Sequence, residues 1–297
     1  MTADSTATAT TVTTVTTVTT AFTAPDGTRL AYHALGEGPP LICLPGGPMQ
    51  DSAYLGDLGG LAAHRRLILL DPRGTGGSAV PRDTGSYRCD RLVDDVETLR
   101  LHLGLDRADL LGHSAGTNLA VLYVARHPER VGRLALITPS VRAVDVPITG
   151  DTRRGTALLR EGEPWFPAAF AALEAVVAGK GDAETFRAVD PFFYGRWDDA
   201  ARAHRDAGEA RKNAEAGEVF GSEGAFDPAA TRAALARFTS PVLVLAGEVD
   251  LNTPPAAAAE VAGLFPRAES AVQPGAGHFP WLDDPARFVS TVAAFLR

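Results

Sequence analysis

Five consecutive residues, Gly112-His113-Ser114-Ala115-Gly116, have types and spacing that could make a serine hydroxyl reactive. Residues 108–111 before them predict a short buried strand, and residues 117–127 after them carry apolar side chains at helical spacing. A serine on a sharp turn between a strand and a helix is exposed, and small neighbours let the two elements cross closely. The pattern therefore indicates Ser114 as a candidate nucleophile.

A serine hydroxyl is a poor nucleophile at neutral pH, so this interpretation requires a histidine base and a carboxylate that orients it. Asp250 follows the apolar run 241–246, which has the length of a strand. His278 lies in a glycine-rich loop further along the chain. The order Ser, Asp, His is typical of enzymes with this kind of strand-to-helix turn. We therefore expect a catalytic triad of Ser114, His278 and Asp250.

Two alternatives to this triad can be weighed from the sequence. An acid could instead follow the apolar run 134–137, but residues 138–140 are Thr, Pro and Ser, and no carboxylate comes before Asp145. His113 is next to the serine, but its position on the turn points it elsewhere. We expect His113 to have a structural role or to line the substrate pocket.

A tetrahedral intermediate also needs N–H donors for its oxyanion, and each donor can contribute about 3 kcal/mol. The apolar residues 40–44 predict a strand that runs into Pro45-Gly46-Gly47-Pro48. Two glycines at a strand end let the backbone approach a substrate and turn an N–H toward it. We expect the donors to be the backbone N–H groups of Gly47 and Ala115, with Gly46 also close to the substrate.

With these residues the chain resembles the serine hydrolases of the α/β-hydrolase fold. Residues 46–48 and the loop 71–78, DPRGTGGS, are similar to the HGGPG and D-x-R-G-x-G-x-S motifs of the proline iminopeptidase branch, peptidase family S33. The resemblance covers roughly residues 20–140 and 238–297. The chain departs from the family at Pro45, where histidine is usual, and at Met49, where the last glycine is usual.

The resemblance implies glutamates that hold the free amino group of the substrate. The Glu-Asn-His-Tyr-Phe-like or tryptophan-rich segment that often announces them is absent, and Glu215 and Glu218 are the nearest candidates. An aminopeptidase is therefore one version of the hydrolase hypothesis. An esterase, lactonase or thioesterase acting on a small or secondary-metabolite substrate is another. A lyase or acyl transferase with the same triad, and a binding role on the same scaffold, are the alternatives from other classes.

The order of expected elements predicts an α/β-hydrolase fold, with a mostly parallel sheet flanked by helices. The expected strands are 41–44, 67–71, 108–111 and 133–137, and the expected helices are 89–103 and 115–127. In such a sheet the loops after the strands gather at one edge. The candidate site residues all lie in loops of that kind.

Residues 141–237 interrupt the alternation of strands and helices. They predict an inserted α-helical cap, or lid, with one helix from 198 to 215, and leave 19–140 and 238–297 as the core domain. Aromatic side chains of the cap either line an apolar pocket, for which Trp165 and Phe193 are the candidates, or pack the cap's own small core.

The first residues of the chain are nearly all threonine, valine and alanine. Residues 1–18 therefore predict a disordered tail, and a strand within 15–24 is the alternative, because threonine and valine favour strands.

Composition narrows the classes of partner. The 297 residues include 36 acidic and 28 basic ones, a net charge of −8, and no basic stripe, which argues against nucleic acid and membrane partners. Cys43 and Cys89 predict neither a disulfide framework nor a metal site, and no metal or organic cofactor is expected. With no signal peptide or membrane span expected, the sequence predicts a cytoplasmic monomer or small homo-oligomer that acts on a small molecule or short peptide.

Overall fold

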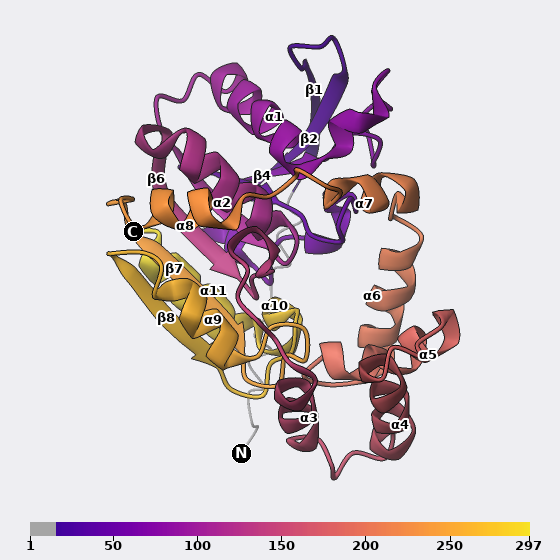
Figure 1. The fold of residues 1–297 in the computed structure, drawn as a ribbon. Helices are drawn as coiled ribbons and strands as arrows, with labels where there is room; N and C mark the ends of the chain where they lie inside the picture. The colour runs from indigo at the N-terminus through magenta and orange to yellow at the C-terminus, as the bar shows by residue number, and fades with distance from the viewer. Residues whose placement is uncertain (1–15) are drawn as a thin grey trace, which may run out of the picture.

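In the computed structural model, which describes residues 16–297, eight strands form one sheet in the order β1-β2-β4-β3-β5-β6-β7-β8 (Figure 1). The strands β1 and β2 pair antiparallel, as do β2 and β4, whereas every later neighbouring pair is parallel. The bounds are β1 Val18–Thr23, β2 Arg29–Leu35, β3 Pro40–Leu44, β4 Arg66–Asp71, β5 Ala108–His113, β6 Val131–Ile137, β7 Val242–Gly247 and β8 Ala268–Gln273. This is the mostly parallel α/β sheet that the sequence predicts.

Helices cover both faces of the sheet. The central parallel strands are almost continuously apolar, as strands buried on both sides must be. Ile42 and Leu44 on β3 share one core with α1, α2 and α9, while Leu41 and Cys43 share the other with α11. These helices span α1 Cys89–His102, α2 Gly116–Arg126, α9 Pro255–Ala262 and α11 Pro285–Phe295, and the short α10 spans Pro280–Asp283.

The predicted tail over residues 1–18 is wrong at its end, because Val18 begins β1. The strand pairs with β2 from Val18 opposite Ala34 to Thr23 opposite Arg29, so backbone hydrogen bonds hold it in the sheet. Residues 1–15, the rest of the predicted tail, lie outside the described residues.

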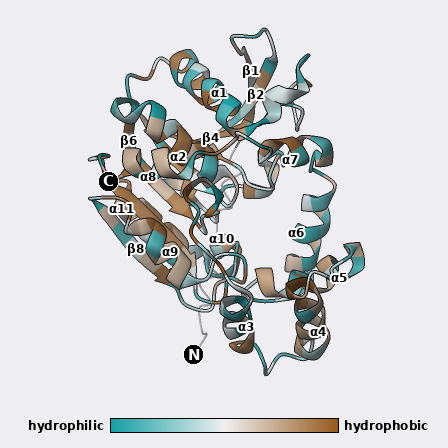
Figure 2. Cartoon of the chain, in the orientation of Figure 1, coloured by the Kyte–Doolittle hydropathy of each residue, from teal (hydrophilic) through white to brown (hydrophobic). Residues whose placement is uncertain are grey.

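The chain between β6 and β7 is helical and divides into two parts. Ala157, Leu173 and Phe192 belong to a core of their own, whereas Phe220 on α7 and Leu235 on α8 join the main core. Figure 2 shows α4 largely in brown and α6 largely in teal and white. The helices are α3 Gly150–Leu158, α4 Phe166–Val177, α5 Ala183–Ala188, α6 Asp199–Glu209, α7 Ala214–Phe220 and α8 Pro228–Leu235.

The helix predicted over 198–215 is in fact two helices, because Asn213 starts a new one. Its side chain accepts a hydrogen bond from the N–H of Ala216 at 3.0 Å, which caps α7. The same side chain donates to the carbonyl of Gly74 at 2.9 Å, and the Asn213 N–H donates to the carbonyl of Met49 at 2.9 Å. These bonds tie α7 to the loops that follow β3 and β4.

Arg73, in the loop after β4, is held by a buried ion pair. Its guanidinium donates two hydrogen bonds of 2.6 Å to the carboxylate of Asp95 on α1, and both side chains are 4% exposed. Asp26, which is 43% exposed, pairs with the same guanidinium. The pair fixes the loop 71–78 to the helix beneath it.

Asp95→Ala should lower the free energy of unfolding by about 3–5 kcal/mol, because the buried charge of Arg73 would lose its main partner. Urea unfolding measures this loss. The matched control is Asp94→Ala, which removes an exposed pair with Arg126 and should cost only ~0–1 kcal/mol. Equal losses in the two variants would contradict the role given to Asp95.

Candidate active site

The turn between β5 and α2 holds Ser114 in a backbone conformation that side chains rarely adopt. Its φ is 52°, in the left-handed region, which costs a non-glycine residue about 1–3 kcal/mol. The Ser114 N–H donates to the carbonyl of Ile137 at 3.1 Å, and the Ser140 N–H donates to the carbonyl of Ser114 at 3.1 Å. Tertiary hydrogen bonds therefore hold the strained turn in place.

Glycine at position 116 allows α2 to start against β3. A Cβ on Gly116 would lie 2.2 Å from the carbonyl oxygen of Leu44. A Cβ on Gly46 would lie 2.8 Å from the Cβ of Ser114. The serine therefore sits directly beside the loop that follows β3, as the sequence predicts.

Hydrogen bonds connect Ser114, His278 and Asp250 in one chain. His278 Nε2 is 2.8 Å from Ser114 Oγ, and His278 Nδ1 is 2.9 Å from Asp250 Oδ2. Because a carboxylate only accepts, Nδ1 carries the ring proton and Nε2 is free to accept from the serine hydroxyl. Asp250 is fully buried and its Oδ1 accepts from the N–H of Asn252 at 2.8 Å. The arrangement can remove a proton from Ser114.

Two backbone N–H groups beside Ser114 have no acceptor within the described part of the chain. Gly47 is exposed with a φ of 118°, and Ala115 is the residue that precedes α2. Across residues 16–297, neither the Gly47 N–H nor the Ala115 N–H donates a hydrogen bond. The N–H of Gly46, by contrast, donates to Tyr54 Oη at 2.7 Å. An oxyanion formed at Ser114 could accept from the first two groups.

Met49 takes the position that the resembling family gives to glycine. Its φ of 56° is left-handed, and its side chain is 2% exposed within the main core. The conformation that usually requires glycine is thus kept, and the side chain is used for packing.

A cleft with a volume of about 540 Å³ opens above Ser114. It is bounded by the loops at the carboxyl ends of the strands and by α5 and α6. We call it the active-site cleft. Its lining residues are Gly47, Gln50, Tyr54, His113, Ser114, Ala183, Phe186, Arg187, Asp190, Phe193, Tyr194, His204, Arg205, Gly208, Glu209, Lys212, Asn252, His278 and Phe279.

Of the residues predicted to bind substrate, His113 and Phe193 line the cleft, whereas Trp165, Glu215 and Glu218 do not. Trp165 packs edge-on against Phe192, 5.0 Å between ring centres, in the core of the inserted helices. Glu215 and Glu218 are exposed on α7, which Asn213 ties to other loops. These three residues therefore lie outside the lining of the cleft, and their predicted contact with substrate stays a prediction.

The acidic side chains of the cleft are Asp190 and Glu209. Burial raises the pKa of Asp190. Its carboxylate accepts no hydrogen bond from the described residues and lies 3.4 Å from Arg205 Nε. A hydrogen bond from Lys212 at 2.9 Å, with the charge of that lysine, lowers the pKa of Glu209. Asp190 is therefore the less satisfied carboxylate in the cleft.

Sequence reasoning missed Tyr54, His204 and Asp190. Each lies on a short helical segment with no motif, and only the packing of those segments brings them to the cleft. His204 Nε2 donates to the carbonyl of Tyr54 at 3.2 Å, and Tyr194 Oη lies 2.9 Å from His204 Nδ1. No local spacing in the sequence encodes these contacts.

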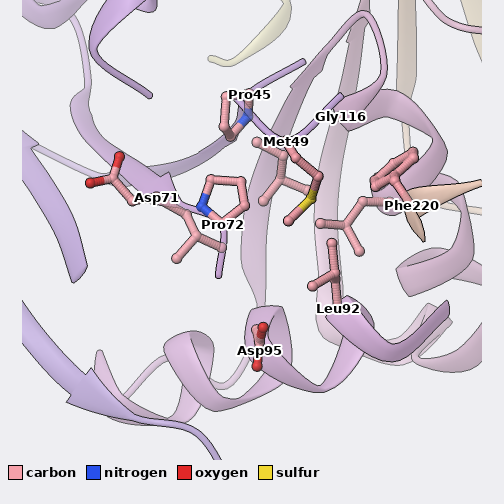
Figure 3. A pocket seen from close by; sticks show the side chains of 11 residues that line it. Pro45, Met49, Asp71, Pro72, Leu92, Asp95, Gly116 and Phe220 are labelled. Carbon is pink, nitrogen blue, oxygen red and sulfur yellow. The ribbon is translucent and has the colours of Figure 1, made fainter. Parts of the chain in front are cut away.

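A second cavity, of only about 20 Å³, lies behind the loop that follows β3. Figure 3 shows Met49, Leu92 and Phe220 around it, with Pro45 and Gly116 at its border. This volume suffices for about one water molecule, and neither Ser114 nor His278 lines it. It is a packing void beneath the site and too small for a substrate.

In the part of the chain that the structure describes, no group of three or more His, Cys, Asp or Glu side chains is placed to hold a metal ion. None of the helices described there is long and apolar enough to cross a membrane.

Comparison with known proteins gives one family and several activities. A model of the alpha/beta hydrolase fold family matches residues 39–285. A proline iminopeptidase of Heyndrickxia coagulans is 40% identical over 108 residues, 36% of this chain and 38% of that protein. The match thus spans little more than a third of that relative. A 2-hydroxymuconate semialdehyde hydrolase of Pseudomonas sp. (strain CF600) is 29% identical over 284 residues, 91% of both chains.

Among solved structures, a thermophilic esterase from Thermogutta terrifontis is similar over 94% of this chain and 98% of that one, with a TM-score of 0.67 and 25% identity.

Gly116→Ala should lower the free energy of unfolding by about 1–3 kcal/mol, because the added Cβ would overlap the backbone of β3. Gly155→Ala on α3 is the matched control. A Cβ there meets no atom within 4 Å. Because alanine favours a helix over glycine, this variant should raise the free energy of unfolding by ~0.5–1 kcal/mol. Urea unfolding of the two variants tests the close crossing of α2 and β3. An unchanged free energy of unfolding in Gly116→Ala would contradict it.

Proposed function

The chain belongs to the α/β hydrolase fold family, and from that premise we propose that it is a serine hydrolase that cleaves amide or ester bonds. The observation that carries the proposal is the hydrogen-bonded chain from Ser114 through His278 to Asp250, at 2.8 and 2.9 Å. A buried carboxylate, a histidine and a serine in this order supply a base for the nucleophile and a partner for the charged base.

In the proposed reaction, His278 Nε2 takes the proton of Ser114 while Ser114 Oγ attacks the carbonyl carbon of the substrate. The carbonyl oxygen becomes an oxyanion and accepts hydrogen bonds from the N–H groups of Gly47 and Ala115. The bond to the leaving group breaks, and the leaving group receives the proton from His278. Water then repeats the sequence on the acyl-enzyme and releases the acid and free Ser114.

We propose that the inserted helices act as a cap over this reaction. Support comes from α5 and α6, which bound the cleft, and from Phe193, whose carbonyl accepts the N–H of His278 at 2.7 Å. Aromatic side chains from both parts of the chain, Tyr54, Phe193 and Phe279 among them, give the cleft apolar walls suited to an apolar acyl or leaving group.

The substrate has two proposed versions, a short peptide with a free N-terminus and an ester. The partial likeness to proline iminopeptidases favours the peptide version. A peptide with a free N-terminus would require a carboxylate near the cleft for its amino group. Asp190 lines the cleft whereas Glu215 and Glu218 do not, which supports Asp190 for that role. The likeness to an esterase over nearly the whole chain favours the second version.

Ser114→Ala should fold normally and fail to react with a fluorophosphonate probe, because the reactive oxygen is gone. Gel fluorescence after labelling measures this. Ser140→Ala, a change at the neighbouring serine that only its backbone connects to the turn, is the control and should label like the parent protein. Labelling that persists in Ser114→Ala would falsify the proposed nucleophile.

Asp190→Asn separates the two substrate versions. If the enzyme is an aminopeptidase, this variant should raise the KM for L-proline p-nitroanilide by roughly 10-fold, a loss of about 1.4 kcal/mol in binding, and affect p-nitrophenyl acetate less. Glu215→Gln is the control and should leave the KM for both substrates unchanged. Turnover of the ester alone by the parent protein would remove the peptidase version.

A further inference from the structure

Tyr54 is a buried residue whose hydroxyl lies between the loop of Gly46 and the side chain of His113. The N–H of Gly46 lies 2.7 Å from Tyr54 Oη, and the same oxygen lies 2.6 Å from His113 Nδ1. A peptide N–H can only donate, so the phenol oxygen accepts from Gly46. Its one proton is then available for His113 Nδ1. The side chain is 8% exposed, and burial raises its pKa, so the phenol keeps that proton.

His113 continues the chain of bonds in one direction. Its Nε2 is 2.9 Å from the carbonyl oxygen of His278, which can only accept. Nε2 therefore carries the ring proton and Nδ1 accepts from Tyr54. With these two bonds, His113 is a neutral imidazole in a single tautomer. Burial, and then the charge of the nearby His278, lower the pKa of His113 well below its usual range. No second positive charge forms beside the base.

The carbonyl of His278 is also fixed from the loop that follows β6, because Thr138 Oγ1 donates to it at 3.0 Å. The N–H of His278 donates to the carbonyl of Phe193 at 2.7 Å. The backbone of the base is thus held on both sides while its ring contacts Ser114 and Asp250.

We propose that Tyr54 and His113 are positioning residues, a relay that holds the loop of His278 at a fixed distance from the loop of Gly46 and Gly47. The proposal rests on the proposed function. The relay runs from the Gly46 N–H through Tyr54 Oη and the His113 ring to the His278 carbonyl. None of its groups is the nucleophile, the base or an oxyanion donor. It sets how the base and the oxyanion donors face Ser114, and a displacement of about 1 Å between such groups can cost on the order of 100-fold in rate.

Tyr54→Phe tests the relay, because it removes the acceptor of the Gly46 N–H and the proton given to His113. With p-nitrophenyl acetate, kcat should fall by roughly 10- to 100-fold while KM changes little, and the rate constant for fluorophosphonate labelling should fall in parallel. The matched control is Tyr123→Phe on α2, which removes another buried hydroxyl, bonded at 2.7 Å to Glu97 on α1. It should keep the parent kcat.

A second pair of variants serves if Tyr54→Phe does not fold. His113→Gln keeps a donor for the His278 carbonyl, whereas His113→Leu removes it, so kcat should follow the order parent, Gln, Leu. Because the two residues belong to one chain of hydrogen bonds, the double variant should lose less kcat than the product of the losses in Tyr54→Phe and His113→Leu. Equal kcat in His113→Gln and His113→Leu would overturn the relay.

The failure of the relay is distinguishable from the failure of the proposed function. Labelling that requires Ser114 but proceeds at the parent rate in Tyr54→Phe overturns the relay alone. Labelling that persists in Ser114→Ala overturns the proposed nucleophile, and the relay with it.

Discussion

The left-handed backbone of Ser114 is the constraint on which the rest of the site depends. A φ of 52° at a residue other than glycine is retained only where its surroundings leave no alternative. Here the surroundings are β3 and β6, which contact the turn through Gly116 and through the bond between Ser114 and Ile137. The sheet therefore holds the serine hydroxyl out of the turn, and every partner of that hydroxyl arrives from a loop at the same edge.

The side chain that must change its charge, His278, has a carboxylate on one side and neutral rings on the other. The His113 ring lies 5.0 Å from that of His278 between ring centres, and His204 lines the same cleft; burial lowers the pKa of both His113 and His204. The fully buried carboxylate of Asp250 is the partner of His278. An imidazolium formed at His278 would thus meet a negative charge on one side and uncharged rings on the other. This is the environment that a base needs if it is to hold a proton briefly and then release it.

Local patterns in the sequence predicted the loops that bring Ser114, Asp250 and His278 together, because strand length and strand ends are encoded by nearby residues. The helix break at Asn213 was not predicted, since it depends on hydrogen bonds to the carbonyls of Met49 and Gly74, which are distant in sequence. Tyr54 was missed because its contacts exist only in the folded chain. The strand that begins at Val18 was missed because a threonine-rich sequence fits both a disordered tail and an edge strand.

In the proposed reaction, Ser114 forms the covalent intermediate. Trypsin should release residues 108–126 as one peptide, in which Ser114 is the only serine. The most direct measurement is peptide mass spectrometry of the protein after reaction with a fluorophosphonate. The proposed mechanism predicts that the added mass lies on Ser114 in this peptide and at no other residue. Modification of a different peptide, with 108–126 left unmodified, would contradict it.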